Sequence, residues 1–399
     1  MDEFSMPVGP VHPAFKEPIQ FKFQVEGEHI VSVDIDMGYN HRGIERAGSK
    51  RNFVQNLYLA ERVCGICSFS HPFAYCRAVE NAAGIEVPDR AHYIRTMIAE
   101  LERIHSHLLW AGVAAHEIGF DSVLHLVWKN REKILDITEA ITGNRINYAM
   151  LMVGGVRRDI NDKQCEQLGK VIDYYLETLG AVEGVFLNDK SIQMRTQGVG
   201  ILTKQKALEL SAVGPTTRAS GVKKDIRQDQ PYAAYTDAVV EPVVPEKPKG
   251  DIFARVWCRL EEVKQSLDVI DYCRKNMPSG ELRAEKNTVK LLADLSQVEG
   301  EGIGRHEAPR GEVTHYVLMK KSQQPFTWKL RAPTYNNVMP WLPMFENAEI
   351  ADIPIIAASI DPCIACADRV TMVENDESRI VSNLDLHKLS IEKTRRMNP

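Results

Sequence analysis

Residues 62–71 read RVCGICSFSH and residues 361–369 read DPCIACADR, so one Cys-x-x-Cys pair lies near each end of the chain. Two thiolates three positions apart can bind one metal ion from a single short turn. A fold that brings the two pairs together directs four soft sulfur ligands at one point. These two stretches therefore constrain the path of nearly the whole chain.

Taken on their residues alone, the pairs are open to three interpretations. One Cys-x-x-Cys pair is a weak signal, because it fits half of a zinc site as well as a redox dithiol. Two pairs fit a structural zinc site, a catalytic metal held by thiolates, or coincidence. Structural zinc sites usually have their pairs tens of residues apart, whereas most of this chain separates the two pairs. The candidate ligands are Cys64, Cys67, Cys363 and Cys366.

The bulk composition argues against several classes of protein. The chain has 399 residues and a formal net charge of −5, and it has no basic stripe interleaved with aromatic residues, so we expect no nucleic-acid partner. Eight dispersed cysteines are too few for a secreted disulfide scaffold and fit a reducing cytoplasm. Residues 1–13 lack a signal-peptide pattern, and no apolar run is long enough to span a bilayer. Attachment to a membrane would therefore need a partner.

The hydrophobic pattern predicts a mainly α fold of the α+β class, with a large helical core and small β-hairpin elements near the N-terminus and in the C-terminal third. Alternating apolar residues predict a hairpin over residues 19–37 and a second strand pair over residues 302–320. Apolar residues at helical spacing predict long helices. These helices cover residues 90–116, 121–144, 161–185 and 251–273, with the chain helical to about Lys286.

Together, the stretches around the two pairs resemble the two signatures of the large subunit of [NiFe] hydrogenases, a highly specific combination. The resemblance implies that family's fold and a nickel–iron centre whose iron carries CO and cyanide ligands. Carried over by position, Cys64 and Cys363 are the terminal nickel ligands, and Cys67 and Cys366 bridge nickel and iron. Soft thiolates match both metals.

Two further motifs resemble the loops that contact the cyanide ligands in this family. In HEAPRGE, the resemblance places Pro309 and Arg310 beside the metal centre. Arg310 would serve there as a fixed cation and hydrogen-bond donor. In RAPT, it places Pro333 and Thr334 there, with the Thr334 hydroxyl as a donor. Without the resemblance, Arg310 would be interpreted as a surface or ion-pair arginine.

Uneven splitting of H₂ requires a proton acceptor beside the metals, and a thiolate, here Cys363, or a nearby basic group can serve. The motif RGIE resembles the family's Arg-Gly-x-Glu element, whose glutamate, here Glu45, is the first proton relay. The alternative is a solvated glutamate after a turn. His71 and Asp361 are expected to hydrogen-bond ligand sulfurs or to orient the loops. A purely structural histidine is the alternative for His71.

Glu26 falls where many relatives bind a remote Mg or Fe ion, but the histidine that completes that site is replaced here by Arg369. This departure argues against a third metal. The remaining cysteines lack iron–sulfur spacing and are expected to be small buried residues. They are Cys76, Cys165, Cys258 and Cys273. Electrons must then pass through another polypeptide, and the implied partner is a small subunit with a [4Fe-4S] cluster.

Residues 214–232 and the motif ELERIHSH at residues 100–107 resemble the quinone-site subunit of respiratory complex I, which shares ancestry with the hydrogenases. Complete cysteine motifs combined with such middle segments are typical of the energy-converting, membrane-bound branch. That branch implies ferredoxin as electron donor, ion-translocating membrane subunits and a position on the cytoplasmic face of the membrane. Formate- and CO-linked relatives share these motifs. Two alternatives stay open. The first is a metal-free subunit that binds a quinone, and the second is a non-enzymatic scaffold held together by zinc.

We expect a single domain over residues 1–399. Its segments are a β-hairpin with the proton-relay loop (1–60), a helical core (61–300), the strand pair with the second cysteine pair (301–369) and an extension (370–399). The extension resembles the one that many relatives lose to a maturation endopeptidase, which implies cleavage after Arg369. Its removal would let the second cysteine pair close over the metals. The alternative is a permanent tail.

Overall fold

A computed structural model describes residues 3–369, 372–374, 377–379 and 383–397. It is about 53% helical with small sheets, which confirms the mainly α, α+β class. Most buried apolar side chains form one large cluster that draws on the N-terminal strands, the long helices and the C-terminal third.

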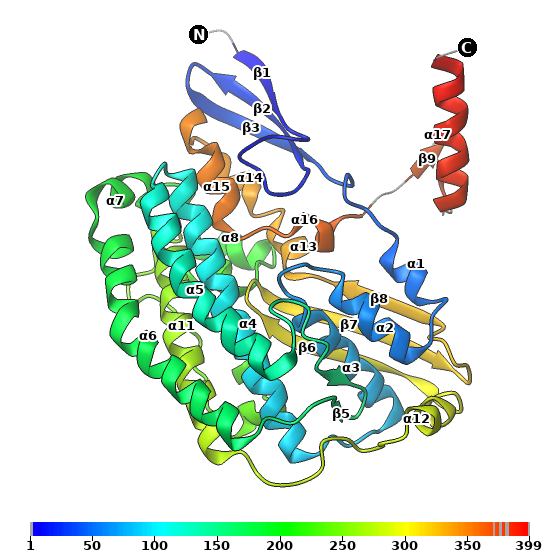
Figure 1. Ribbon diagram of the computed structural model, residues 1–399. Helices are drawn as coiled ribbons and strands as arrows, with labels where there is room; N and C mark the ends of the chain where they lie inside the picture. The colour runs from blue at the N-terminus through cyan, green and yellow to red at the C-terminus, as the bar shows by residue number, and fades with distance from the viewer. Residues whose placement is uncertain (1–2, 370–371, 375–376, 380–382, 398–399) are drawn as a thin grey trace.

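Four long helices lie side by side and form one side of the molecule (Figure 1). Helix α4 contacts α5 and α11, and α6 also contacts both of these helices. The side chains of Asn161 and Asp251 cap α6 and α11. The four predicted long helices are thus confirmed to within a few residues. They are α4 (Asp89–Glu117), α5 (Asp121–Thr142), α6 (Asp162–Asn188) and α11 (Ile252–Asn276).

The prediction that the chain stays helical to about Lys286 was wrong. Helix α11 ends at Asn276, and Met277 already has an extended backbone. A residue before proline disfavours the helical conformation, and Pro278 follows Met277 directly. The next helix, α12 (Thr288–Leu295), begins only after an irregular segment.

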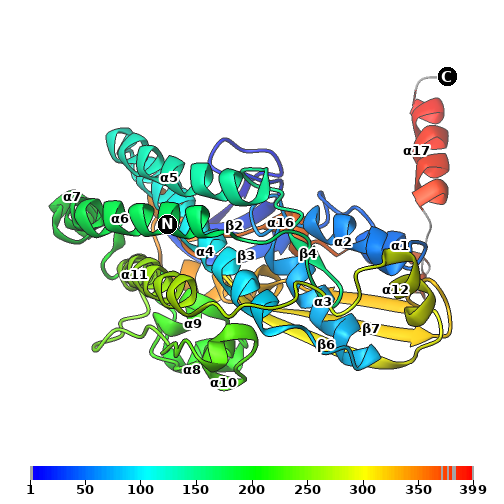
Figure 2. The same cartoon turned by 60° about the horizontal axis from the view of Figure 1, so that its bottom comes forward.

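A three-stranded antiparallel sheet forms the other side of the molecule, with α3 (Ser70–Ala83) packed on it (Figure 2). The predicted strand pair is confirmed as its first two strands, whereas the third strand was not predicted. The sheet consists of β6 (Glu299–Ala308), β7 (Gly311–Lys320) and β8 (Thr327–Arg331). Helix α3 approaches β6 closely because Gly304 has no side chain: a Cβ there would lie 1.9 Å from the carbonyl oxygen of Ala74.

A second antiparallel sheet lies near the N-terminus, and the predicted hairpin supplies two of its three strands. Its buried residues Phe21 and Phe23 pack against the rings of Trp341 and Phe345 on α14 (Trp341–Phe345). The first strand was not predicted. The strands are β1 (Glu3–Val8), β2 (Gln20–Glu26) and β3 (His29–Asp36).

Short elements connect these layers, and two helices fall in the segment where only a hairpin and a loop were predicted. These two are α1 (Ile44–Gly48) and α2 (Phe53–Glu61). The others are β4 (Leu151–Met152), β5 (Gly155–Val156), α7 (Lys190–Thr196), α8 (Lys204–Glu209), α9 (Gly214–Arg218), α10 (Ile226–Asp229), η1 (Ala233–Thr236), α13 (Pro333–Asn337), η2 (Ile350–Asp352), α15 (Ile353–Ser359) and α16 (Ile364–Ala367).

The segment after Arg369 contains β9 (Met372–Glu374), β10 (Glu377–Arg379) and α17 (Asn383–Met397). Helix α17 stands apart from the rest of the molecule in both views (Figures 1 and 2). The predicted cleavage would fall between Arg369 and residue 370, and residues 370–371 lie outside the described part of the chain. Among the described residues, no helix combines the length and the apolar character that a membrane crossing requires.

Candidate metal centre

The two cysteine pairs, far apart in sequence, lie close together in the folded chain. The first pair lies in the loop between α2 and α3, and the second lies at the start of α16. The sulfur atoms of Cys64, Cys363 and Cys366 all lie within 4.8 Å of one another, and the Cys363 and Cys64 sulfurs are 3.3 Å apart. All four cysteines are buried and unpaired by disulfides. Residues that are far apart in the sequence therefore form one compact group of soft candidate ligands.

The fourth sulfur, that of Cys67, lies outside this three-sulfur group and accepts a hydrogen bond from Nη1 of Arg310 at 2.8 Å. Thiol hydrogen bonds from Cys363 and Cys366 lower the pKa of Cys64 well below its usual value. A thiolate is the form of cysteine that binds metals. Four buried thiols with one already predisposed to lose its proton fit a site for nickel and iron, and equally for zinc.

Arg310 connects the two cysteine loops. It follows Pro309 in the turn between β6 and β7, and its Nε and Nη2 donate to the backbone oxygen and to Oδ1 of Asp361 at 2.7 and 2.8 Å. Burial alone would lower the pKa of Arg310, but Asp361 and the neighbouring thiolates raise it well above its usual value. Arg310 is therefore a buried cation that is hydrogen-bonded to the Cys67 sulfur and to Asp361, just before the second pair.

Thr334 holds the backbone of the second pair. Its Oγ1 accepts a hydrogen bond from the N–H of Cys363 at 3.0 Å, and its side chain is buried. Pro333 occupies the first position of α13, where a missing N–H costs nothing. The structure thus places Thr334 against the second pair and Arg310 against Cys67 and Asp361, and Pro333 and Pro309 directly precede these two residues in the chain.

Arg42 contributes a contact that sequence reasoning missed. Its guanidinium donates to the carbonyl oxygens of Arg62 and Val63 at 2.8 and 2.6 Å and to that of Ala365 at 2.8 Å. One side chain therefore binds both cysteine loops together. The RGIE motif drew attention to this arginine, but its acceptors are backbone carbonyls, which no sequence pattern identifies.

Glu17 is the second residue that sequence reasoning missed. Its Oε2 accepts hydrogen bonds from the N–H groups of Ile364 and, at 3.2 Å, Ala365, inside the second pair. Burial raises the pKa of Glu17 above its ordinary value, and the Cys64 thiolate adds to the rise. The residue lies in the irregular segment between β1 and β2, so periodicity gave no signal for it. The structure places a carboxyl with a raised pKa next to the cysteines.

Glu45, the predicted proton relay, is engaged elsewhere. Its carboxylate pairs with Nζ of Lys329 at 2.8 Å, accepts from the N–H of Leu330 at 3.1 Å and lies 3.5 Å from Nη2 of Arg369. Among the described hydrogen bonds, none joins Glu45 to a cysteine. Its relay role stays a prediction.

His71 lies in the first turn of α3, and its Nδ1 is 3.1 Å from Nε2 of His315 on β7. Burial lowers the pKa of His71 to about 4, so the ring is neutral near pH 7. Glu102 on α4 accepts hydrogen bonds from the N–H groups of Phe69 and Ser70 at 2.6 and 3.0 Å, which fixes the chain just after Cys67. Sequence reasoning did not single out Glu102.

The other expectations about metals and cysteines concern residues away from this group. Among the described residues, the cysteines form the one cluster of three or more metal-ligating side chains, and it does not include Glu26 at the end of β2. Of the remaining cysteines, three are buried and Cys165 is half-buried. The buried ones are Cys76, Cys258 and Cys273.

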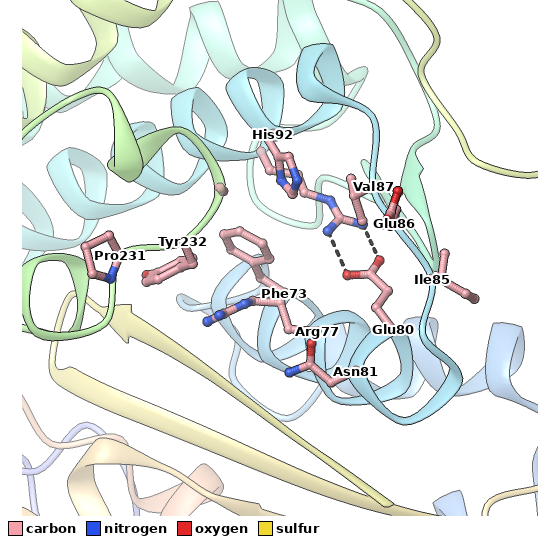
Figure 3. Close-up of a pocket in the computed structure, with 12 residues that line it drawn as sticks. Phe73, Arg77, Glu80, Asn81, Ile85, Glu86, Val87, His92, Pro231 and Tyr232 are labelled. Atoms are coloured by element: carbon pink, nitrogen blue, oxygen red, sulfur yellow. Dashed lines mark hydrogen bonds and ion pairs between the residues drawn. The ribbon is translucent and has the colours of Figure 1, made fainter. Parts of the chain in front are cut away.

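A cavity of about 480 Å³ lies along α3, the start of α4 and residues 231–233 (Figure 3). Glu80 and Arg95 form a two-fold ion pair inside it, with nitrogen–oxygen distances of 2.6 and 3.0 Å. None of the predicted site residues lines this cavity. The cavity is thus separate from the cysteine cluster.

Comparisons with known proteins place the chain among two related groups. A family model described as respiratory-chain NADH dehydrogenase, 49 Kd subunit, matches residues 117–369, and one described as nickel-dependent hydrogenase matches residues 42–112. The chain is 48% identical to the membrane-bound hydrogenase subunit alpha of Pyrococcus furiosus, over 99% of this chain and 94% of the relative. It is 38% identical to the carbon monoxide-induced hydrogenase of Rhodospirillum rubrum, over 92% of this chain and 100% of the relative. A solved chain of the membrane-bound sulfane sulfur reductase, an archaeal respiratory membrane complex, superposes with a TM-score of 0.86 at 29% identity, covering 92% of this chain and 99% of that chain.

Proposed function

The chain belongs to the large-subunit family of [NiFe] hydrogenases, in the membrane-bound branch related to the 49 kDa subunit of respiratory-chain NADH dehydrogenase, and we propose that it is the catalytic subunit of an energy-converting hydrogenase. Its reaction is the reversible reduction of two protons by two electrons to H₂. The observation that carries the proposal is the gathering of buried cysteine sulfurs from both ends of the chain around Arg310.

The cysteines would hold the metals in the arrangement that the family implies. Cys64 and Cys363 would hold the nickel, and Cys67 and Cys366 would supply thiolates to both metals. When bound, this centre supplies the redox chemistry that interconverts protons, electrons and H₂. Thiolate ligands match nickel and low-spin iron, and the buried setting excludes water that would compete for the metals.

The residues around the cysteines would bind the iron's cyanide ligands. Arg310 brings a buried positive charge, and Thr334 brings a hydroxyl, to opposite loops of the cysteine cluster. Anionic ligands in a dry site need such donors, because a buried charge without partners is costly. Pro309 and Pro333 would border the same ligands and leave no N–H of their own unpaired.

Protons would leave the cluster through carboxyl groups. Glu45 is the relay that the Arg-Gly-x-Glu motif implies, and Glu17 is the carboxyl that contacts the second cysteine pair. Because burial raises the pKa of Glu17, this side chain can take up and release a proton at lower cost than a solvated glutamate. The Cys363 thiolate would serve as the proton acceptor at the metals.

Electrons would arrive through partners. A small subunit with a [4Fe-4S] cluster would deliver them from ferredoxin, and membrane subunits would translocate ions with the energy released. The relatives are subunits of membrane-bound complexes, which supports a position at the membrane through partners, and we propose its cytoplasmic face. A maturation endopeptidase would remove the residues after Arg369. No nucleic acid takes part.

Metal analysis of the purified native complex tests the proposal. We expect one nickel and one iron bound through this chain beyond the iron of the clusters, and both are lost in Cys64→Ser but kept in the matched control Cys258→Ser. One zinc per chain would instead identify a structural scaffold. A chain with no metal would favour the quinone-binding alternative, which the match to the 49 kDa subunit family keeps open.

A further inference from the structure

A group of buried charged side chains lies between the long helices and the end of β6. It contains four carboxylates and three guanidinium groups, and each of these side chains is at most 2% exposed. Water cannot screen charges in such a place, so the group must balance its charges internally. The carboxylates are Glu100, Asp225, Glu262 and Glu307, and the cations are Arg103, Arg218 and Arg227.

Six of the seven side chains form a closed ionic ring in which carboxylates and arginines alternate. Three of its contacts, each between a side-chain nitrogen and a carboxylate oxygen, are shorter than the other three. The contacts are Glu100–Arg103 (3.0 Å), Arg103–Glu262 (3.7 Å), Glu262–Arg218 (2.7 Å), Arg218–Asp225 (3.4 Å), Asp225–Arg227 (2.7 Å) and Arg227–Glu100 (3.2 Å). Three negative and three positive charges make the ionic ring neutral on its own.

Glu307 is the seventh member and lies outside the ionic ring. Its Oε1 accepts a hydrogen bond from Nη1 of Arg218 at 2.8 Å, and its Oε2 accepts a long one from the N–H of Ile226 at 3.3 Å. Arg218 already pairs with two carboxylates of the ionic ring. An ionised Glu307 would therefore be a buried negative charge without a cation of its own, which is costly.

Neighbouring cations on the long helices do not supply the missing charge. His107 on α4 donates from Nε2 to Glu262 at 2.9 Å, but burial lowers its pKa to about 4, so its ring is neutral near pH 7. Arg259 on α11 lies over the ring of Trp110, and its Nε and Nη2 have no hydrogen-bond partner among the described residues. Arg259 is therefore not paired with any of the four carboxylates.

The other groups that face Glu307 leave it unpaired as well. Glu312 lies opposite it in the register of β7, and it is a carboxylate with cations of its own. The Tyr232 hydroxyl accepts a hydrogen bond from the N–H of Glu307 at 3.0 Å, and Arg77 on α3 lies over the Tyr232 ring. Burial lowers the pKa of His306 well below its usual value, so that ring is neutral too.

We propose that this buried group holds one dissociable proton and that Glu307 carries it. Burial and the neighbouring Asp225 raise the pKa of Glu307 from 4.5 to about 7. Burial would also raise the pKa of the three carboxylates in the ionic ring, but their flanking arginines lower it below its usual value. Glu307 is thus the member that releases and takes up its proton near neutral pH.

The position of this proton connects it to the turn that carries Arg310. Glu307 precedes Arg310 by three residues, and its backbone oxygen accepts a hydrogen bond from Nη2 of Arg103 at 2.5 Å. Release of the proton would leave one uncompensated negative charge at the base of this turn. Any effect of that charge on H₂ turnover rests on the proposed function, whereas the proton itself is a property of this chain.

Infrared difference spectra of the full-length chain, recorded about one pH unit below and above 7, detect protonated carboxyl groups through their C=O stretch. We expect a carboxyl band that disappears at the higher pH in the wild type and is missing in Glu307→Gln. Glu312→Gln is the matched control and should keep the band. Glu312 is also buried, but Arg331 and Lys224 lower its pKa although burial would raise it.

Urea unfolding of the same chains at several pH values gives the second measurement. Because the pKa of Glu307 is higher in the folded than in the unfolded chain, its stabilising contribution is present below pH 4.5 and is lost as the pH rises through 7. The folding equilibrium constant of Glu307→Gln relative to that of the wild type should therefore rise about 100-fold between pH 4.5 and 7. The same ratio for Glu312→Gln should stay nearly constant.

The inference is overturned if the carboxyl band survives in Glu307→Gln, or if the stability ratio of this variant does not change with pH. Loss of the pH dependence in His107→Gln and not in Glu307→Gln would also overturn it, because the proton would then belong to the histidine. Neither measurement depends on bound nickel or iron. A purified complex without these metals would contradict the proposed function, and both measurements would still decide whether Glu307 holds the proton.

Discussion

Glu17 and Arg42 show, at the scale of single residues, what the sequence reveals about the centre and what it does not. The cysteines, Arg310 and Thr334 belong to motifs whose chemistry can be recognised in the sequence, and the structure brings them together. Glu17 and Arg42 act through backbone N–H and C=O groups of distant loops. Such acceptors and donors occur at every position, so only the folded chain identifies them.

At this scale we predict that Glu17→Gln slows H₂ turnover by about 100-fold, because general acid–base groups typically contribute that much or more. The amide keeps an oxygen for the N–H groups of Ile364 and Ala365 but cannot carry a proton away. Glu45→Gln should have the smaller effect, because Lys329 and Arg369 hold Glu45 in ion pairs. Turnover assays at matched nickel content check this. A larger loss in Glu45→Gln would return the relay to the position that the motif implies.

A second prediction concerns His107 on α4, which is fully buried and hydrogen-bonded to Glu262 at 2.9 Å. Burial lowers its pKa from 6.5 to about 4. Its contribution to stability is therefore complete above pH 6.5, where the unfolded state is also neutral, and is lost as the pH falls toward 4. We expect the Tm of His107→Gln to fall less steeply than the Tm of the wild type as the pH is lowered from 6.5 to 4. Parallel profiles in that range would contradict the neutral assignment.

At the scale of elements, the contact of α3 with the sheet depends on the absence of a side chain. We predict that Gly304→Ala destabilises the chain by about 1–3 kcal/mol, the usual cost of overpacking, because its Cβ would collide with the backbone of α3. Gly180→Ala in α6 is the control: no atom lies within 4 Å of the added Cβ, and alanine should stabilise the helix by about 0.5–1 kcal/mol. Urea unfolding measures both. Equal stability of the two variants would show that α3 can move away from β6.

The long helices were predictable because their apolar residues recur at helical spacing over many turns. Helices α4 and α11 are examples. Strands β1 and β8 are short, and each pairs along one side only, so few positions report their alternation. The early end of α11 was signalled by Pro278, which outweighs the helical pattern before it. Pairing of β8 with β7 also depends on contacts that no local pattern contains.

At the scale of the whole molecule, a buried ionic network joins elements that are far apart in sequence. Arg218 on α9 donates to Glu262 on α11 at 2.7 Å and to Glu307 on β6 at 2.8 Å, and it lies 3.4 Å from Asp225. All of these side chains are almost completely buried. The network therefore connects the long helices to the strand that leads to Arg310.

We predict that Arg218→Met costs about 3–5 kcal/mol of unfolding free energy, because it removes the cation that Glu307 is paired with and one of the two cations that Glu262 and Asp225 each contact. Arg145→Met is the control: Arg145 also contacts three carboxylates, but they are solvent-exposed, and such pairs contribute about 1 kcal/mol or less. Denaturant unfolding of both variants separates the two cases. A loss in Arg218→Met no larger than that in Arg145→Met would mean that the network does not hold these elements together.

The central claim is that four cysteines from both ends of the chain hold a nickel–iron centre with CO and cyanide on the iron. Infrared spectroscopy of the purified native complex, in the region where only such diatomic ligands absorb, tests it most directly. We predict bands from CO and from cyanide that disappear in Cys363→Ser. A nickel- or zinc-loaded wild-type complex without any of these bands would contradict the account.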